Sequence, residues 1–177
     1  PQMKLFRRDM IKYKTAEEIA LMREAAQIVS RTLGKIAEVI RPGITGIELD
    51  QLAETYIRSQ DAIPAFKGLY GCPSTILVSI NEQVVHGLPT DRKIEEGDIV
   101  SVDCGAIYKG YYGDHAFTFA IGEVTEEKKQ LLKVTEECLY LGIEQARVGN
   151  RLEDIGWAIQ THAEKHGYGV VRDLVGH

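Results

Sequence analysis

The sequence lacks any apolar run that could cross a membrane. Its amino end, PQMKLFRRDMIKYK, also lacks the apolar centre of a signal peptide. Cysteine is scarce, with 3 in 177 residues and no CxxC pair, which argues against a zinc knuckle and a disulfide framework. We therefore expect a cytoplasmic protein with no membrane attachment, in a reducing environment.

A positive charge excess is missing too, since 21 basic residues face 26 acidic ones and the net charge is -5. This balance argues against a general nucleic-acid binder, and no specific nucleic-acid site is expected. The 44% hydrophobic and 27% charged content is ordinary for a globular protein. A chain of 177 residues is long enough for one domain with a sizeable core.

Apolar residues at helical spacing predict a long helix over residues 15–40, opened by the capping-box pattern Thr15-Ala-Glu-Glu18. A second helix is expected to start at Thr45 or Gly46. Turn-forming residues predict a loop over 63–73, and residues 75–80 read as a strand. Residues 81–98 are expected to be irregular.

The segment 99–120, IVSVDCGAIYKGYYGDHAFTFA, predicts a β-hairpin that carries Asp103 on one arm and Asp114 on the other. A loop of Tyr108-Lys109 would place the two carboxylates opposite each other, and a loop of Lys109-Gly110 would place Asp114 opposite Gly105. Both registers put the carboxylates on one sheet face. Because facing like charges are destabilising, we expect a shared proton, a nearby Arg or Lys, or a metal cation. Solvent-facing carboxylates are the plain alternative.

The pattern then returns, because helices are predicted from Thr125 and from Leu152 to about His166, followed by a strand over 170–175. We interpret this as a helix-helix-strand unit used twice, an α/β (α+β) fold whose ligand site lies between the halves. The second unit has no hairpin, so the second half is expected to be incomplete. His162 and His166 lie one helical turn apart, which can bind a metal, although a solvated helix face is favoured.

Three segments resemble bacterial type I methionine aminopeptidase: VVHGLP, GDIVSVDCGAIYKGYYGDHAFTF and VVRDLVGH. The resemblance runs from Thr15 to His177 and implies the pita-bread duplication around an antiparallel sheet. It implies one catalytic-type domain over 1–177 that lacks its carboxy-terminal part. The activity implied is metal-dependent removal of the initiator methionine.

By this resemblance Asp103, Asp114 and His177 are three of the five ligands of a two-metal site, with Asp114 bridging. Carboxylates and an imidazole suit Co, Mn, Fe or Zn. The two further ligands of the family are glutamates that follow the histidine. The chain by itself is therefore expected to bind metal weakly at most and to have little or no aminopeptidase activity.

His86 resembles the family histidine that contacts the substrate beside the scissile amide, where it donates a hydrogen bond or shuttles a proton. The methionine pocket maps to Phe66, Leu69, Cys72 and Leu77, where this sequence departs from the cysteine and tyrosine common in the family. A loop histidine and plain core packing are the alternatives at these positions.

The function implied is thus a metalloaminopeptidase acting on the N-terminal Met of nascent peptides, and the resemblance also implies ribosome association. Two alternatives share the fold: an X-Pro-type metallopeptidase and a non-catalytic binding module. A half-fold that pairs with a second copy is a third, since an unclosed sheet edge attracts a partner.

Overall fold

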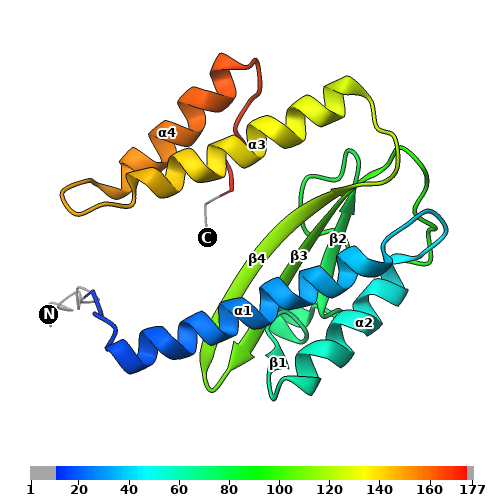
Figure 1. Ribbon diagram of the computed structural model, residues 1–177, viewed down its shortest axis with the longest axis horizontal. Helices are drawn as coiled ribbons and strands as arrows, with labels where there is room; N and C mark the ends of the chain where they lie inside the picture. Colours follow the sequence, from blue (N-terminus) through cyan, green and yellow to red (C-terminus); the bar gives the residue numbers. More distant parts are fainter. Residues whose placement is uncertain (1–10, 175–177) are drawn as a thin grey trace, which may run out of the picture. The chain divides into compact units, whose positions relative to one another are not determined.

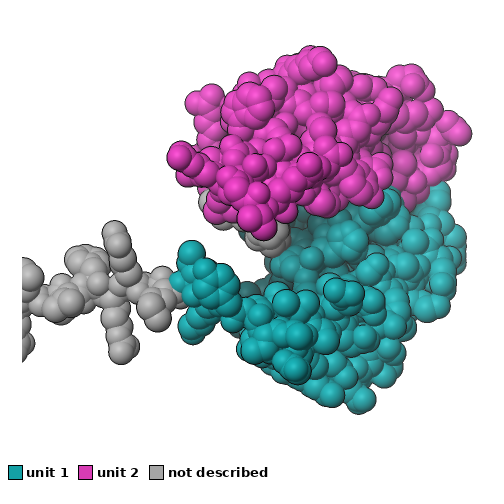
Figure 2. Space-filling view, turned by 60° about the vertical axis from the view of Figure 1, so that its left-hand side comes forward, with its two compact units in different colours: residues 1–94, 100–119 teal, residues 95–99, 120–177 magenta. Residues whose placement is uncertain are grey.

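The computed structural model describes residues 11–174 of the chain. The chain divides into two compact units, coloured separately in Figure 2. Unit 1 comprises residues 1–94 and 100–119, and unit 2 comprises residues 95–99 and 120–177. None of the helices in the described part of the chain combines the length and the apolar character needed to span a membrane.

Two capped helices open unit 1: α1 (Ala16–Val39) and α2 (Gly46–Ser59). The predicted capping box is present at α1, because the Glu18 N–H donates to Thr15 Oγ1 at 3.2 Å and the Thr15 N–H donates to the Glu18 carboxylate at 2.8 Å. Thr45 caps α2 in the same way. Both helix starts are therefore where the sequence predicts them, since local side-chain acceptors satisfy the first backbone donors.

The sheet of unit 1 is organised around β3 (Ile99–Tyr108), which pairs with β1 (Ile63–Pro64), β2 (Ile76–Ile80) and β4 (Tyr111–Ala120), as Figure 1 shows. The predicted loop over 63–73 is wrong at two places. Residues 63–64 form β1, and Leu69–Gly71 form a short 3₁₀ helix. Turn-forming residues dominate this segment, so the sequence predicts a loop throughout. β1 forms nevertheless, because it pairs with distant residues of β3.

The β3–β4 hairpin turns at Lys109 and Gly110, whose φ angles of 48° and 84° are those of a two-residue turn with both central residues left-handed. This loop pairs Ser101 with Thr118, and their hydroxyl oxygens lie 2.8 Å apart. The same register puts Asp114 opposite Gly105, so the alternative loop of residues 108–109 is wrong.

One face of this sheet is covered by the two helices, with α1 crossing β4 and β3 in Figure 1. The inward positions of β3 have 0% exposure: Val100, Val102, Cys104 and Ala106. A Cβ added at Gly113 would lie 2.4 Å from the carbonyl oxygen of Ala25, so the backbones of β4 and α1 are in direct contact. Alternation along the strands leaves the other face to Asp103 and Asp114.

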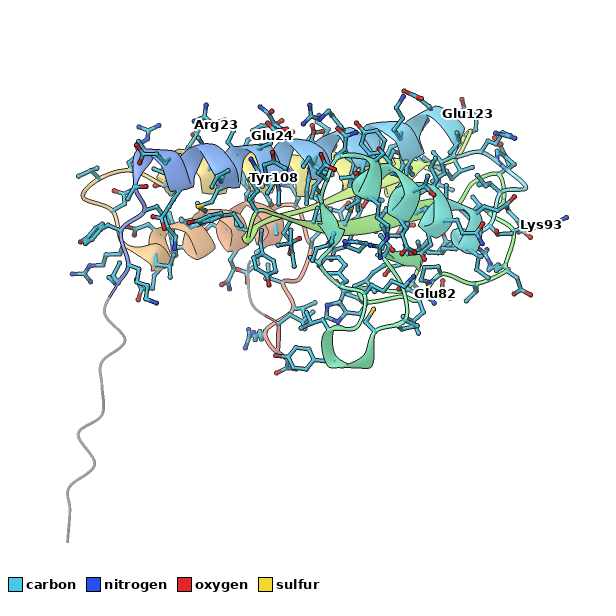
Figure 3. All side chains as sticks on the ribbon, turned by 90° about the horizontal axis from the view of Figure 1, so that it is seen from below. Arg23, Glu24, Glu82, Lys93, Tyr108 and Glu123 are labelled. Carbon is cyan, nitrogen blue, oxygen red and sulfur yellow. The ribbon has the colours of Figure 1, made fainter. Side chains whose placement is uncertain are left out.

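The long connection between β2 and β3 is hydrogen-bonded to the segment before α2. Ile94 donates its N–H to the carbonyl of Ile44 at 2.8 Å and accepts from the N–H of Gly43 at 2.8 Å. Figure 3 labels Glu82 near the start of this connection and Lys93 near its end, where the Lys93 side chain extends away from the ribbon. The connection is irregular, as the sequence predicts, but it is anchored at its end.

Unit 2 is built on α3 (Glu126–Gln145) and α4 (Leu152–Lys165), which pack against each other. Their contact buries Val134, Cys138 and Ala163. The strand predicted over 170–175 is wrong in its described part, since residues 170–174 have no strand structure. A strand needs a ladder partner, and the described residues of this unit contain no whole strand, only the end residues of β3 and β4.

Candidate metal centre

Asp103 lies in the middle of β3, on the sheet face opposite to the one covered by α1 and α2. Its cross-strand partner on β2 is Leu77, so the two side chains share that face. The residue is half-buried, and its Oδ1 atom exposes less than 1 Å². A carboxylate in such a position is far more costly to ionise than one in solvent unless charges or donors compensate.

Asp114 lies on the neighbouring strand and is exposed. The hairpin register places it opposite Gly105, one diagonal step from Asp103. The charges of Asp103, Asp114 and Asp50 all act on Cys104: burial first, and then these carboxylates, raise the pKa of its thiol to about 12. Asp103 and Asp114 share one sheet face, where a divalent cation would offset their like charges, whereas Asp50 approaches from α2 on the other face.

Gly105 allows an aromatic side chain to approach this stretch. A Cβ at residue 105 would meet Cε1 of Phe66 at 2.7 Å and Cβ of Ala65 at 3.0 Å. Any larger residue would thus push the Phe66 ring away from the strand. Phe66 and Leu77 are both half-buried and give the carboxylates apolar neighbours.

His86 lies in a loop whose backbone is pinned to β2. The Val78 N–H donates to the Gly87 carbonyl at 2.7 Å, and the Gly87 N–H donates to Ser79 Oγ at 3.1 Å. His86 is exposed and has φ of 60°, a left-handed conformation that is uncommon for residues other than glycine but that histidine adopts more readily than most. The anchored neighbour therefore presents the imidazole to solvent from a fixed backbone.

The other predicted pocket residues lie on the segment before β2. Cys72 is half-buried, with its Sγ 3.6 Å from both the carbonyl and the hydroxyl oxygen of Ser74. Leu69 is 52% exposed on the 3₁₀ turn. His177, the third predicted ligand, lies outside the described residues, so the described part of the predicted metal site is its carboxylate pair.

Asp50 is a supporting residue that the sequence did not reveal. Its Oδ1 accepts the backbone N–H groups of Thr75 and Ile76, each at 2.8 Å, and so ties α2 to the start of β2. Burial, the larger effect, raises its pKa, and the two hydrogen bonds oppose that rise. An acidic residue within an amphipathic helix looks solvent-facing in sequence, so no local signal pointed to this role.

The sequence profile of metallopeptidase family M24 matches residues 20–177, a span that includes the hairpin and the anchored loop. The chain belongs to metallopeptidase family M24. Use of divalent metal follows from this family. Carboxylate oxygens fit such ions, and the shared face of Asp103 and Asp114 supplies them in unit 1.

Within family M24, a protein named methionine aminopeptidase from Clostridium acetobutylicum is 53% identical over 169 residues, covering 95% of this chain and 68% of that protein. The crystal structure of methionine aminopeptidase from Rickettsia prowazekii superposes with a TM-score of 0.93 at 42% identity, covering 95% of this chain and 68% of that one. A Xaa-Pro dipeptidase from Bacillus anthracis gives 0.76 at 30% identity and covers 93% and 44%. The pita-bread fold expected from the motifs is thus confirmed.

Proposed function

We propose that the native protein that carries this sequence is a methionine aminopeptidase that removes the N-terminal methionine of nascent proteins. The observation that carries the proposal is the carboxylate pair of Asp103 and Asp114 on one face of a family M24 sheet. The divalent metal use of the family supports a metal site on that face. The identity to proteins named methionine aminopeptidase favours the substrate class.

Asp103 and Asp114 are the residues that we propose to hold the divalent ions, with His177 as a further ligand. Bound ions of the Mn, Fe, Co or Zn class would supply Lewis acidity toward the scissile carbonyl and lower the pKa of the attacking water. The two strands fix the carboxylates by a ladder, so their separation changes little when a ligand binds. The half-buried site of Asp103 keeps the local dielectric low, which strengthens its attraction for cations.

Phe66 and Leu77 are proposed to receive the methionine side chain. Both are apolar, and both are placed by contacts with β3 beside the carboxylates. Thioethers pack well against aromatic rings and aliphatic groups. Cys72 and Leu69 are proposed to extend this surface from the preceding turn.

His86 is proposed to act on the scissile amide as a hydrogen-bond donor or proton shuttle. An imidazole changes charge near neutral pH, so it can do either. The two hydrogen bonds of Gly87 hold its backbone at the edge of β2. Replacement of His86 should therefore lower kcat more than it raises KM.

The test compares Met-Ala-Ser with Ala-Pro peptides in the native protein that carries this sequence, in Mn²⁺, Co²⁺, Fe²⁺ or Zn²⁺. We expect methionine release only from the first peptide. Asp103→Asn and Asp114→Asn should each lower kcat at least about a hundredfold, because each removes a negative charge that is proposed to hold the divalent ions. Asp91→Asn is the matched control, because Asp91 is an exposed loop carboxylate outside the site.

Other results would favour the alternatives. Preferential cleavage of Ala-Pro would make the protein an X-Pro-type peptidase, in line with its resemblance to the Xaa-Pro dipeptidase. Tight peptide binding without metal uptake or cleavage would make it a non-catalytic binding module. Equal activity of the Asp103→Asn and Asp91→Asn variants would refute the proposed ligands.

We also propose a cytoplasmic site of action with the ribosome as a partner, since the proposed substrate is the nascent chain. The described cysteines, Cys72, Cys104 and Cys138, are all free thiols, which suits a reducing compartment. Co-sedimentation with ribosomes at low and physiological salt would test the partnership, and absence from the ribosomal pellet at both would count against it.

A further inference from the structure

Unit 2 carries a second group of metal-binding side chains, far in sequence from Asp103 and Asp114. Glu137 lies on α3, His162 on α4, and His166 at the carboxy-terminal cap of α4, which runs back along α3 in Figure 1. One ligand-type atom from each residue lies within 4.8 Å of the others. The sequence places the two histidines one helical turn apart, and the packing of α3 against α4 adds the carboxylate.

The carboxylate and the first imidazole are already in contact. His162 Nε2 lies 2.7 Å from Glu137 Oε2, and the side chains are 20% and 39% exposed. Because an ionised carboxylate only accepts, the ring nitrogen donates its proton here. That contact and the nearby charges of Lys133, His162 and His166 lower the pKa of Glu137, so it is a charged ligand at neutral pH.

The second imidazole is oriented by the backbone. His166 Nδ1 lies 2.9 Å from the carbonyl oxygen of His162, which can only accept, so Nδ1 carries the hydrogen. This leaves the lone pair on Nε2, and a backbone carbonyl behind the ring is the usual outer partner of a metal-binding histidine. The two rings are near neighbours, with centroids 4.5 Å apart and planes at 54°.

We propose that Glu137, His162 and His166 form a site for one divalent transition ion of the Zn²⁺, Ni²⁺ or Cu²⁺ class. Two imidazoles and a carboxylate are a common ligand set for such ions. The ion replaces the proton between His162 Nε2 and Glu137 Oε2. That proton moves to His162 Nδ1 when the ring is neutral, and to solvent when both ring nitrogens carry a hydrogen. Bond lengths of about 2.1 Å in a tetrahedron need roughly 3.4 Å between the two ligand atoms, so the pair opens by a small side-chain movement.

Lys133 is a cation beside the site, with its Nζ 4.0 Å from Glu137 Oε1. Its side chain is 68% exposed, so it can swing into solvent when an ion binds. The bound ion would link α3 to α4 in addition to their apolar contact.

The test uses the whole 177-residue chain with Asp103→Asn and Asp114→Asn, so that binding at the proposed catalytic centre does not contribute. Titration with Zn²⁺ alone in a calorimeter should show one ion per chain. His162→Gln and His166→Ala should each weaken binding at least tenfold, because each removes a ligand. Glu136→Gln, an exposed carboxylate one position from Glu137, should leave the affinity within twofold.

A second readout is local. Trp157 is the only tryptophan, and it lies five residues before His162, about 7.5 Å along the helix axis. Cu²⁺ should quench its fluorescence, and the quenching should disappear in the His162→Gln/His166→Ala double variant. The same double variant in the otherwise unaltered chain should lose one Zn²⁺ equivalent, which guards against poor folding of the aspartate variants.

Two outcomes would overturn the site. One is absence of saturable Zn²⁺ binding in the folded Asp103→Asn/Asp114→Asn chain. The other is Zn²⁺ affinity unchanged by the double histidine variant. Either would leave Glu137, His162 and His166 as an ion pair and a ring contact alone, and neither bears on the proposed peptidase activity.

Discussion

At the residue scale, close approach explains several glycines better than backbone freedom does. Gly113 faces the backbone of α1, and a Cβ there would lie 2.4 Å from the oxygen and 2.5 Å from the carbonyl carbon of Ala25. Gly105 faces the Phe66 ring. One residue thus brings a helix onto the hairpin, and the other brings an aromatic side chain beside the proposed metal ligands.

The clearest single-residue prediction concerns Gly113→Ala. The methyl group meets backbone atoms, which cannot rotate away, so we expect a loss of about 3 kcal/mol in the free energy of unfolding, the upper end for overpacking. Gly34→Ala is the control, because Gly34 lies within α1 and a methyl group there would have no neighbouring atom within 4 Å. It should gain about 0.5–1 kcal/mol from helix propensity. Urea unfolding of both variants measures the contrast, and similar midpoints would contradict it.

At the scale of elements, hydrogen bonds between neighbouring residues and hydrogen bonds between distant segments have different roles. Thr15, Thr45 and Thr125 each accept an N–H from the first turn of their helices, so each helix start is specified by adjacent residues. Asp50 instead joins two elements, since its carboxylate accepts from residues 25 and 26 positions away. The first kind of contact sets boundaries, and the second sets how β2 is placed against α2.

Two substitutions of Asp50 separate the effect of its charge on stability from the effect of its hydrogen bonds. Asp50→Ala leaves the N–H groups of Thr75 and Ile76, both in residues with 0% exposure, without their acceptor, so we expect a loss of about 2 kcal/mol or more. Asp50→Asn keeps an acceptor oxygen and removes the buried charge, so it should be far milder. Chemical denaturation at pH 7 compares the two, and equal losses would contradict the assignment.

The pH dependence of this pair has a definite sign. Because burial raises the folded pKa of Asp50 above its ordinary value of 3.8, the folded protein binds this proton more tightly than the unfolded chain. Wild-type stability should therefore fall relative to Asp50→Asn as pH rises through 3.8 to the raised pKa. Unfolding curves at several pH values across that window would measure the free energy of unfolding of both proteins. A wild-type free energy that rises relative to that of Asp50→Asn as pH increases would contradict the prediction.

At the scale of the whole molecule, the two units bury very different amounts of apolar surface. Unit 1 has a core that includes Ile28, Ile36, Leu49 and Val102, all exposed by 1% or less. The buried cluster of unit 2 is small, and several of its large apolar side chains are exposed by more than half: Leu139, Tyr140, Ile143, Leu152 and Trp157. Local stability increases with buried apolar contact, so unit 1 should have the higher local stability.

Hydrogen exchange should reveal that difference. We expect backbone amides in the middle of α3 and α4 to exchange at least tenfold faster than those of β3 and α1, because fewer buried side chains oppose opening of the α3–α4 hairpin. Saturating Zn²⁺ should slow α3 and α4 selectively if the second metal site forms. Equal protection in the two units without metal would contradict the prediction.

Parts of the fold and of the candidate site are predictable from the sequence, and parts are not. The starts of three helices, the extent of the hairpin and the shared face of Asp103 and Asp114 were predictable, since they depend on caps, period and a turn within one segment. The choice between two turns was not, because both leave the carboxylates on that face. The strand over 170–175 was predicted wrongly, because an apolar β-branched run does not say whether a partner strand is present. The proposed roles of His86 and the pocket residues stay predictions.

The sequence by itself determined the four long helices and the hairpin, the alternation that separates Val102 and Cys104 from Asp103, and the motifs that lead to family M24. These are properties of neighbouring residues, which interact whatever the rest of the chain does. Only the tertiary structure decided that Phe66 packs on Gly105, that Asp50 holds the start of β2, and that Glu137 joins His162 and His166. Each of these depends on two segments distant in sequence meeting in space, and packing geometry rather than local preference selects which side chains then touch.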